Sequence, residues 1–480
     1  MDAIGYRLCN HCSVLNAARA ALTGPVSSLP GTQLSKWTDL PLRLTILTGR
    51  RAQYVHALHE KYGAVVRIGP REVDISDRTA ARQIHRANSG FLKSSFYATG
   101  GRFQSMFSTR DPVFHAKRRR LLGGCFTEAA LAKLEPTILN LAQTAVVKMG
   151  KESRAHGCVD VLKWWTLLAM DVIGQLSFGQ SFDMVERGEK NQFAKDVASA
   201  GSILPLRTAF PTVLWLGSYL PFIPYLQDIG QSRQRIMAYQ QERISRYLHL
   251  VEHGSEDTAK TFFATLVKGQ SAELTPVDMM VEVQSYVTAG TDTTAVTLTY
   301  LIWAVCKNPA IQTRLTRELQ AGPKVPSYKA LRELPYLQCV VEEALRCYGA
   351  APGSLPRDVP SGGSTLAGHY IPEGVVVSTQ AYSLHRDPEA FPDPERFDPS
   401  RWESPTQQMK DAFCAFGTGP RGCIGVHLAR MELCLAAALF FRAYPDAKIS
   451  DKDGMSDMDM DLSISFLLMP RGHRCLVEVQ

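Results

Sequence analysis

The pattern of hydrophobic and polar residues predicts a chain that is mostly helical between about Asp111 and Gly349. Its longest apolar run extends from about Met279 to Val305, with no proline after Pro276 and none before Pro309. Because proline interrupts helices, this uninterrupted stretch predicts one long helix buried in the protein.

Short apolar segments nearer the two ends predict strands. Val65–Ile68 and Val73–Ile75 are separated by Gly69-Pro70, which is a turn signal. Further strands are predicted at residues 368–377 and 463–479, and the acidic stretch 451–461 is predicted to be a surface loop. The expected fold class is therefore mainly α with small β-sheets.

One large domain is predicted for residues 30–480, preceded by a segment at residues 1–29. No Pro/Gly/Ser-rich linker, charge block or internal repeat divides the chain, and 45% hydrophobic residues suffice for a sizeable core. Residues 1–28 include Asp2, Arg7 and Arg19 and have no uninterrupted apolar stretch. They predict neither a transmembrane helix of about 20 apolar residues nor a secretory signal.

The net charge of the chain is modest for its length. Lys and Arg number 53 and Asp and Glu number 46, which gives +7. No concentrated basic stripe with aromatic or motif support is present, so nucleic-acid binding is not predicted.

Candidate chemistry is concentrated in the run Phe416-Gly417-Thr418-Gly419-Pro420-Arg421-Gly422-Cys423-Ile424-Gly425. Its glycines let backbone amides approach the Cys423 sulfur, and Arg421 is a fixed cation suited to a carboxylate. A thiolate persists at neutral pH only near positive or partially positive groups. The run resembles the haem-binding loop of the cytochrome P450 monooxygenases, Phe-x-x-Gly-x-x-Arg-x-Cys-x-Gly, at every fixed position, and a thiolate ligand to haem iron is the chemistry that it suits.

A second motif, Ala289-Gly290-Thr291-Asp292-Thr293-Thr294, places a glycine and polar residues within the long apolar helix. Such residues weaken a helix, so their presence indicates that something at this position requires them. The cytochrome P450 resemblance implies a loosened turn beside the iron, where Asp292 and Thr293 relay protons to oxygen. A threonine-rich helix packed by back-bonding is the alternative interpretation.

A third motif is the pair Glu343 and Arg346, which lie three residues apart and share a helix face. In the family such a pair forms a buried triad with a later arginine. We predict Arg401 as that partner, because it lies 22 residues before Cys423. Arg396 lies 27 residues before the cysteine and is predicted to be a solvated look-alike.

Further basic residues are assigned to the haem propionates by the same resemblance. His115 and Arg119 lie four residues apart on one helix face, and Arg357 occupies a stretch where the family has another propionate ligand. The implied cofactor site has Cys423 as the metal ligand and includes Arg421, Arg119, Arg357, Phe416 and Gly425.

The function implied by the resemblance is that of a haem-thiolate monooxygenase. It would hold haem b and insert one oxygen atom from O2 into a lipophilic small molecule. Phrases such as Ile68-Gly69-Pro70-Arg71-Glu72-Val73 look most like filamentous-fungal members, many of which act in secondary metabolism. The expected substrate pocket comprises Ser285, Thr288, Ala289, Ala350, Ala351 and Phe466.

An electron donor is implied as well, since nothing in the chain resembles a flavin or nicotinamide site. NADPH electrons would arrive through a separate cytochrome P450 reductase, with cytochrome b5 as an additional donor. Complementary charge speeds such encounters. Candidates for a basic docking face are Lys117, Arg118, Arg120 and Arg430.

Two alternatives remain open. Some haem-thiolate proteins rearrange peroxides or reduce nitric oxide, but these often lack the acid–alcohol pair formed here by Asp292 and Thr293. A non-catalytic haem sensor would keep the cysteine without needing that pair. The substrate, and the choice among hydroxylation, epoxidation, desaturation and coupling, are not encoded in these motifs because pocket shape decides them.

The expected location is the cytosolic side of the endoplasmic reticulum, as a peripheral protein, or the cytosol. The ten cysteines other than Cys423 are interpreted as reduced, mostly buried thiols. Phe210–Leu226 is apolar but contains three prolines, which argue against a spanning helix. It is interpreted either as a segment that dips into lipid at the substrate entrance or as a proline-broken part of the core.

Overall fold

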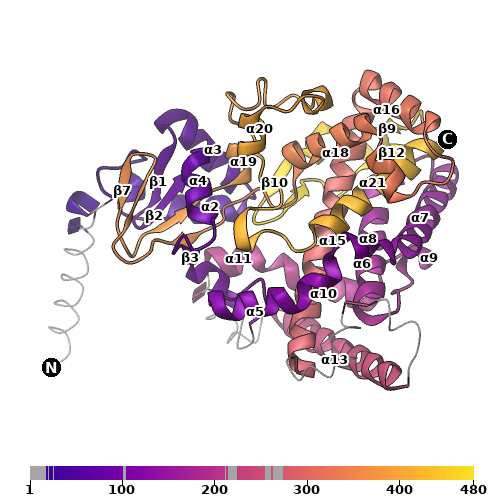
Figure 1. The fold of residues 1–480 in the computed structure, drawn as a ribbon, viewed down its shortest axis with the longest axis horizontal. Coiled ribbons are helices and arrows are strands. Elements are labelled where there is room, and N and C mark those ends of the chain that lie inside the picture. The colour runs from indigo at the N-terminus through magenta and orange to yellow at the C-terminus, as the bar shows by residue number, and fades with distance from the viewer. Residues whose placement is uncertain are drawn as a thin grey trace.

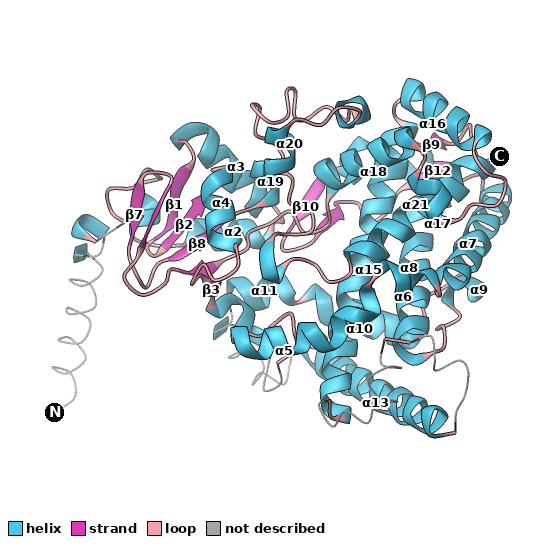
Figure 2. Cartoon of the chain, in the orientation of Figure 1, coloured by secondary structure: helices cyan, strands magenta, loops and turns pink. Residues whose placement is uncertain are grey.

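The computed structural model describes residues 18–19, 21–24, 26–100, 104–210, 212–213, 224–253, 261–262 and 274–480. A large helical body occupies one side of the molecule and a smaller, sheet-containing part the other (Figure 1). Figure 2 shows that the strands are few and short, which confirms the predicted fold class. Most of the segment Phe210–Leu226, weighed as a membrane contact, lies outside the described residues.

Helices supply most of the structure. They are α2 (Leu40–Leu47), α3 (Arg51–Tyr62), α4 (Arg78–His85), α5 (Pro112–Gly123), α6 (Glu128–Ala132), α7 (Glu135–His156), α8 (Val161–Phe178), α9 (Met184–Arg187), α10 (Gln192–Ser202), α11 (Leu204–Ala209), α13 (Pro224–Glu252), α15 (Pro276–Cys306), α16 (Pro309–Ala321), α17 (Tyr328–Arg332), α18 (Pro335–Tyr348), α19 (Ala381–Leu384), α20 (Gln407–Ala412) and α21 (Val426–Ala443). Over the described ranges, none of them combines the length and the apolar character needed to cross a membrane.

The long helix predicted from the apolar run is α15, which passes through the middle of the helical body (Figure 1). Thr275 and Asp278 form a reciprocal capping box at its start, and Pro276 occupies the first turn, where no amide donor is needed. Leu298 and Leu301 are fully enclosed in a core shared with α8, α18 and α21. Each such side chain stabilises the fold by about 1.5–3 kcal/mol.

The main sheet joins distant parts of the chain in the order β1-β2-β8-β5-β3. Its strands are β1 (Val65–Gly69), β2 (Glu72–Ile75), β8 (Val376–Ser378), β5 (Arg357–Asp358) and β3 (Leu92–Lys93). β1 and β2 form the predicted antiparallel pair, and β2 runs parallel to β8. β3 pairs antiparallel with β5, so that Lys93 stands directly opposite Arg357.

The remaining strands form small sheets. They are β4 (Val159–Asp160), β6 (Ser364–Leu366), β7 (His369–Ile371), β9 (Lys448–Ile449), β10 (Leu462–Ile464), β11 (Leu468–Pro470) and β12 (Leu476–Glu478). The acidic stretch predicted as a loop contains two short 3₁₀ turns, η7 (Lys452–Gly454) and η8 (Asp457–Met460).

Candidate active site

The loop of residues 416–425 includes the 3₁₀ turn η6 (Gly419–Arg421) and leads into α21. Local backbone hydrogen bonds hold it: the amide of Cys423 donates to the carbonyl oxygen of Phe416 at 2.8 Å, and the amide of Gly422 to that of Gly419 at 3.0 Å. Gly419 has a φ of 67°, and a Cβ there would overlap the carbonyl oxygen of His85, so the position requires glycine. The backbone thereby fixes where Cys423 stands.

Cys423 is the exposed thiol among the nine cysteines that the structure describes, all of which are free. Although its side chain is exposed, the protein around it desolvates the thiol and raises its pKa. The Gly425 amide and the Arg119 guanidinium act in the opposite direction. The positive surroundings read from the sequence are therefore present but weaker than desolvation, and a metal ion is what deprotonates a coordinating thiol outright.

Two arginines connect the cysteine loop to α5 and to the segment before it. Arg119 donates to the carbonyl oxygen of Gly422 at 2.7 Å, and Arg421 donates to that of Thr109 at 3.0 Å. His115 is buried nearby, where desolvation, followed by Arg421 and Arg119, lowers its pKa to about 4. At neutral pH it is therefore an uncharged ring beside the two arginines.

Lys93 and Arg357 add two more buried cations at the edge of the main sheet. They are 6% and 4% exposed, respectively. Lys93 Nζ donates to the carbonyl oxygen of Phe107 at 2.5 Å and lies 4.1 Å from the centre of the Tyr97 ring. Desolvation, then Arg357 and Arg421, lower the pKa of Lys93 to about 6, and desolvation followed by Arg357 lowers that of Arg421 to about 10. At neutral pH the Lys93 amine is therefore mostly uncharged until an anion binds beside it.

The charges of this cluster are only partly compensated by the described residues, among which Asp111 acts on Arg421 against the repulsion from Arg357. Among the described residues, none of the ion pairs includes Lys93, Arg119, Arg357 or Arg421. Buried charges are ordinarily paired, so a gathering of cations fits a bound anionic group. A haem has two propionates and an iron that accepts a thiolate, and this donor set suits both. Sequence reasoning missed Lys93, because only the pairing of β3 with β5 brings it to Arg357.

The second predicted motif lies in the middle of α15. Contrary to the expected loosened turn, the helix continues unbroken through Gly290. The hydroxyl of Thr293 donates to the carbonyl oxygen of Ala289 at 2.7 Å. Burial raises the pKa of the neighbouring Asp292 carboxyl, and Lys190 acts against this. Back-bonding by threonine, the alternative interpretation, is thus present alongside a half-buried, partly desolvated acid at the preceding position.

Comparison with known proteins agrees with this arrangement. A family model described as Cytochrome P450 matches residues 35–477.

The chain belongs to the cytochrome P450 family.

Three similar proteins are fungal monooxygenases of this family. "Cytochrome P450 monooxygenase tazI" of Aspergillus terreus is 46% identical over 97% of this chain and 96% of its own length. "Cytochrome P450 monooxygenase orf2" of Aspergillus niger is 40% identical, covering 95% and 94%. "Cytochrome P450 monooxygenase stcB" of Emericella nidulans is 37% identical, covering 97% and 90%. The protein is a cytochrome P450 monooxygenase, as the motifs implied, and the rearranging and sensor alternatives lose their support.

In this cytochrome P450, Glu343 lies at the centre of a buried ionic group on α18. Arg346 Nε is 2.8 Å from one of its oxygens, and Arg401 Nε is 3.0 Å from the other. The indole of Trp402 also donates to the carboxylate, at 2.9 Å. Arg396 is exposed and offers its backbone carbonyl to Arg346 at 3.1 Å, and none of the ion pairs between described residues includes it.

Glu432 is a second buried acid that sequence reasoning did not single out. It lies on α21, nine residues after Cys423, and accepts a hydrogen bond from the hydroxyl of Thr294 on α15 at 3.0 Å. Burial raises its pKa to about 8, although the Thr294 hydrogen bond acts to lower it. The sequence signal that could have identified it is a single glutamate within the apolar helix that follows the cysteine loop. The contact joins the helix after the cysteine to the helix that carries Asp292 and Thr293.

The expected substrate-pocket residues fall in two places. Three lie at helical spacing on α15, where Thr288 and Ala289 are exposed and Ser285 is half-buried within an otherwise largely buried helix. The exposed face formed by these three residues is consistent with a lining role.

The other expected pocket residues lie close to the turn between β10 and β11. Ala350 is tied to this hairpin, because the amide of Leu468 donates to its carbonyl oxygen at 2.8 Å. Phe466 in the turn lies with its ring centre 6.0 Å from that of Phe96 and 6.2 Å from that of Phe107. Ala351 follows Ala350 and is half-buried.

Two of the four residues predicted for a basic docking face are engaged elsewhere, and that part of the prediction is wrong. Arg118 is buried and forms an ion pair with Asp278 at the start of α15. Arg430 contacts both oxygens of Glu342. The remaining two, Lys117 and Arg120, are exposed on α5.

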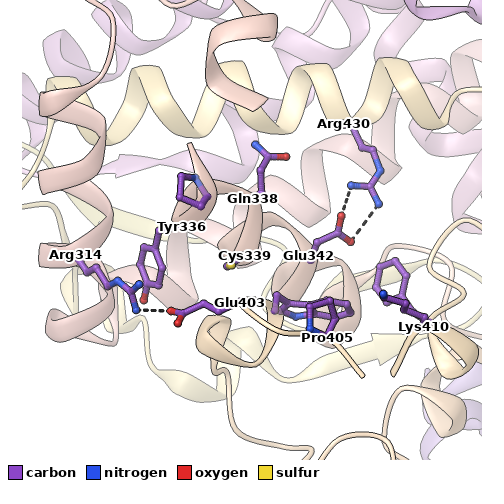
Figure 3. Close-up of a pocket in the computed structure, with 12 residues that line it drawn as sticks. Arg314, Tyr336, Gln338, Cys339, Glu342, Glu403, Pro405, Lys410 and Arg430 are labelled. Carbon is purple, nitrogen blue, oxygen red and sulfur yellow. Dashed lines mark hydrogen bonds and ion pairs between the residues drawn. The ribbon is translucent and has the colours of Figure 1, made fainter. Parts of the chain in front are cut away.

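A separate hollow of about 510 Å³ lies behind the cysteine loop, between α16, α18 and the segment before α20. Figure 3 shows that ion pairs within its own walls, Arg430 with Glu342 and Arg314 with Glu403, use up most of its charge. It contains none of the residues predicted for the haem or for oxygen chemistry. The candidate active site is therefore the region around Cys423 and the buried cations.

Proposed function

We propose that Cys423 is the axial ligand of a haem b, and that Arg119, Arg357 and Arg421, joined by Lys93, hold its propionates. Phe416 and Gly425 would shape the loop on the cysteine side. When bound, the haem supplies oxygen activation, which a thiolate ligand favours by pushing electron density toward O–O cleavage. The observation that carries the proposal is an exposed cysteine in the loop of Arg421, which lies near the buried Lys93 and Arg357; none of these three basic groups forms an ion pair with another described residue.

Asp292 and Thr293 are proposed to deliver protons. The raised pKa of the half-buried Asp292 brings its proton affinity closer to neutrality, which suits a group that takes up and releases protons. The Thr293 hydroxyl, which donates to the Ala289 carbonyl oxygen, would be the second group of the pair that supplies protons. Substrate packed against Ser285, Thr288 and Ala289 would exclude competing water.

The reaction proposed is insertion of one oxygen atom into a lipophilic small molecule of the kind found as fungal secondary-metabolite intermediates. Ala350, Ala351 and Phe466 would complete the apolar lining opposite α15. Such a lining selects by shape and leaves the site of oxidation to the way the substrate lies over the haem.

Electrons are proposed to come from an NADPH–cytochrome P450 reductase, with cytochrome b5 as an additional donor, through the outer face of α5. A hollow of about 670 Å³ there is lined by Val113, Ala116, Lys117 and Arg120, among others. Val113 is 76% exposed. An apolar centre flanked by two free cations suits an acidic partner, because charge steers the encounter and the apolar contact holds it.

For location, we propose peripheral contact with the cytosolic face of the endoplasmic reticulum. α2 exposes Leu40, Leu44 and Leu47 at helical spacing, and the preceding turn exposes Leu34 and Trp37. Exposed apolar stripes with tryptophan are typical of surfaces that lie in the membrane interface.

Flotation with phosphatidylcholine–phosphatidylserine vesicles tests this location. Replacing Leu40, Leu44 and Leu47 together by serine should abolish flotation. The same replacement of three exposed valines elsewhere, Val147, Val277 and Val325, is the matched control and should not. Flotation that survives the leucine changes would assign the membrane contact to another surface, and a wild type that never floats would place the protein in the cytosol.

The difference spectrum of the dithionite-reduced protein with carbon monoxide tests the proposed function. A Soret band strongly red-shifted from that of an imidazole-ligated haem is expected. Cys423→Ala should remove it, whereas Cys414→Ala, at a neighbouring half-buried thiol, should not. A haem-replete wild type that shows only the imidazole-type band would overturn the assignment of Cys423.

A further inference from the structure

The segment of residues 104–111, which connects to α5, has neither helix nor strand and is held by charged side chains from distant elements. The amide of Met106 donates to Oε1 of Glu282 at 2.8 Å. On the other side, Lys93 donates to the carbonyl oxygen of Phe107 at 2.5 Å and Arg421 to that of Thr109 at 3.0 Å. The segment thus bridges α15 and the buried cation cluster.

Glu282 is an unusual group for its place in the fold. It lies on α15, is 1% exposed, and its second oxygen has no hydrogen-bond partner among the described residues. The charge of Arg118 acts on this carboxyl, and the carboxyl in turn acts on the hydroxyl of Tyr286. Arg118 Nη1 and Tyr286 Oη are also buried without a hydrogen-bond partner among the described residues. A buried carboxyl is costly, and the Met106 hydrogen bond, followed by the charge of Arg118, is what favours its ionised form here.

The Met106 hydrogen bond fixes the backbone next to Phe107 and therefore the position of the Phe107 ring. Phe107 is 49% exposed, whereas its neighbour Tyr97 is buried. Its ring centre lies 5.7 Å from that of Tyr97 and 6.2 Å from that of Phe466, both in edge-to-face geometry. Lys93 Nζ lies 4.3 Å from the Phe107 ring centre. The rings form a wall that is packed on one side and accessible on the other.

We propose that Glu282 is a positioning residue that fixes Phe107, through the Met106 amide, as an aromatic wall of the substrate pocket, and that the substrate carries a planar aromatic or conjugated ring that packs on this wall. Aromatic pairs in offset or edge-to-face geometry gain free energy beyond simple burial, and they require the wall ring to be held at a defined angle. This inference rests on the proposed function, since the pocket matters only if the haem binds at Cys423.

Binding titrations of the holoenzyme with imidazole and with 4-phenylimidazole test the wall. Both probes ligate the iron through nitrogen, but only the second presents an aromatic ring to the pocket, so the ratio of their affinities isolates the wall. Phe107→Ala should lower the preference for 4-phenylimidazole about three- to tenfold, with imidazole affinity unchanged. Tyr370→Ala, at an exposed aromatic residue on β7, is the matched control.

Two substitutions at Glu282 test the positioning. Glu282→Gln retains an oxygen that accepts from Met106 and should keep the preference, whereas Glu282→Leu loses the acceptor and should lower it as Phe107→Ala does. Hydrogen exchange at the Met106 amide should speed up in Glu282→Leu and stay slow in Glu282→Gln. An unchanged preference in Glu282→Leu would overturn the positioning role. If that variant does not fold, an unchanged preference in Phe107→Ala would overturn the proposal.

The outcomes separate this inference from the proposed function. If the reduced wild type with carbon monoxide lacks the thiolate-type band, the assignment of Cys423 fails, while hydrogen exchange at Met106 still decides whether Glu282 holds the segment. If the band is present and the preference for 4-phenylimidazole is unchanged in both Phe107→Ala and Glu282→Leu, the proposed aromatic wall is overturned and the assignment of Cys423 stands.

Discussion

Lys93 and Arg357 show how strongly single residues in this site depart from ordinary charge pairing. They stand opposite each other on adjacent strands, where like charges destabilise a sheet. Their burial and mutual repulsion bring the pKa of Lys93 down to about 6. A bound propionate would reverse this situation, because it supplies the opposite charge that both side chains lack. Relief of the repulsion between Lys93 and Arg357 would thus contribute to the affinity for the cofactor.

Replacing Lys93 by methionine should therefore speed the loss of haem. A charge-assisted hydrogen bond contributes about 1.5–3 kcal/mol, so transfer of haem to apomyoglobin should be about tenfold faster or more. Lys61→Met removes an exposed lysine from α3 and is the control. Equal transfer rates in the two variants would show that Lys93 does not contact the cofactor.

At Thr293, replacement by alanine should uncouple electron use from product formation. General acid groups contribute about 10²–10⁴-fold to such steps, so product per NADPH should fall at least tenfold while hydrogen peroxide rises. The assay uses a reductase and an alkoxyresorufin as a lipophilic probe. Thr291→Ala is the control, because that hydroxyl is buried and bonds to the carbonyl oxygen of Val287. Unchanged coupling in Thr293→Ala would remove this residue from the proposed relay.

At the scale of elements, local signals were sufficient where the chain itself sets the boundary. α15 begins at Pro276 and ends at Cys306, shortly before Pro309, so the prolines that bracket its apolar run mark its limits. Pairing between distant segments has no comparable signal in the local sequence. The pairing of β3 with β5, and therefore the position of Lys93 opposite Arg357, was not predictable. Helix phase explains the basic run on α5: Arg118 shares the inward face with Leu122, whereas Lys117 points outward.

Contact between α15 and α21 depends on Glu432, whose raised pKa makes it sensitive to pH. Its folded pKa of about 8 exceeds the ordinary 4.5, so the folded protein holds an extra proton between these values and stability falls as pH rises through this range. Glu432→Gln removes the free-energy cost of ionising a buried carboxyl and leaves an oxygen that accepts the hydrogen bond from Thr294. The variant should match the wild type near pH 5 and exceed its stability at pH 8, by on the order of a few kcal/mol.

Thermal unfolding followed by circular dichroism at pH 5 and pH 8 measures this difference. Glu333→Gln, at an exposed glutamate after α17, should show the same Tm as the wild type at both values. A Glu432→Gln advantage that does not grow between pH 5 and pH 8 would mean that Glu432 is already ionised in the folded protein.

At the scale of the whole molecule, the net charge of +7 arises from basic residues both in the interior and on the surface of the protein. Lys93, Arg357 and Arg421 account for part of it at the proposed haem site, where propionates would neutralise two charges. Arg118 and Arg430 are neutralised by acids within the protein. Among the exposed basic residues, Lys117 and Arg120 on α5 flank the apolar Val113, and this group is the one proposed to meet an electron donor.

Charge reversal of Lys117 and Arg120 together should slow reduction by the reductase severalfold at low salt. The difference should shrink as ionic strength rises, because exposed charges are screened over about 10 Å at 0.1 M salt. Lys324→Glu, an exposed lysine after α16, changes the net charge in the same direction without touching α5 and should reduce the rate little. Stopped-flow reduction under carbon monoxide gives the rates directly. A wild-type rate that is flat from low to high ionic strength would exclude charge steering, and equal effects of all three reversals would assign the steering to net charge rather than to this face.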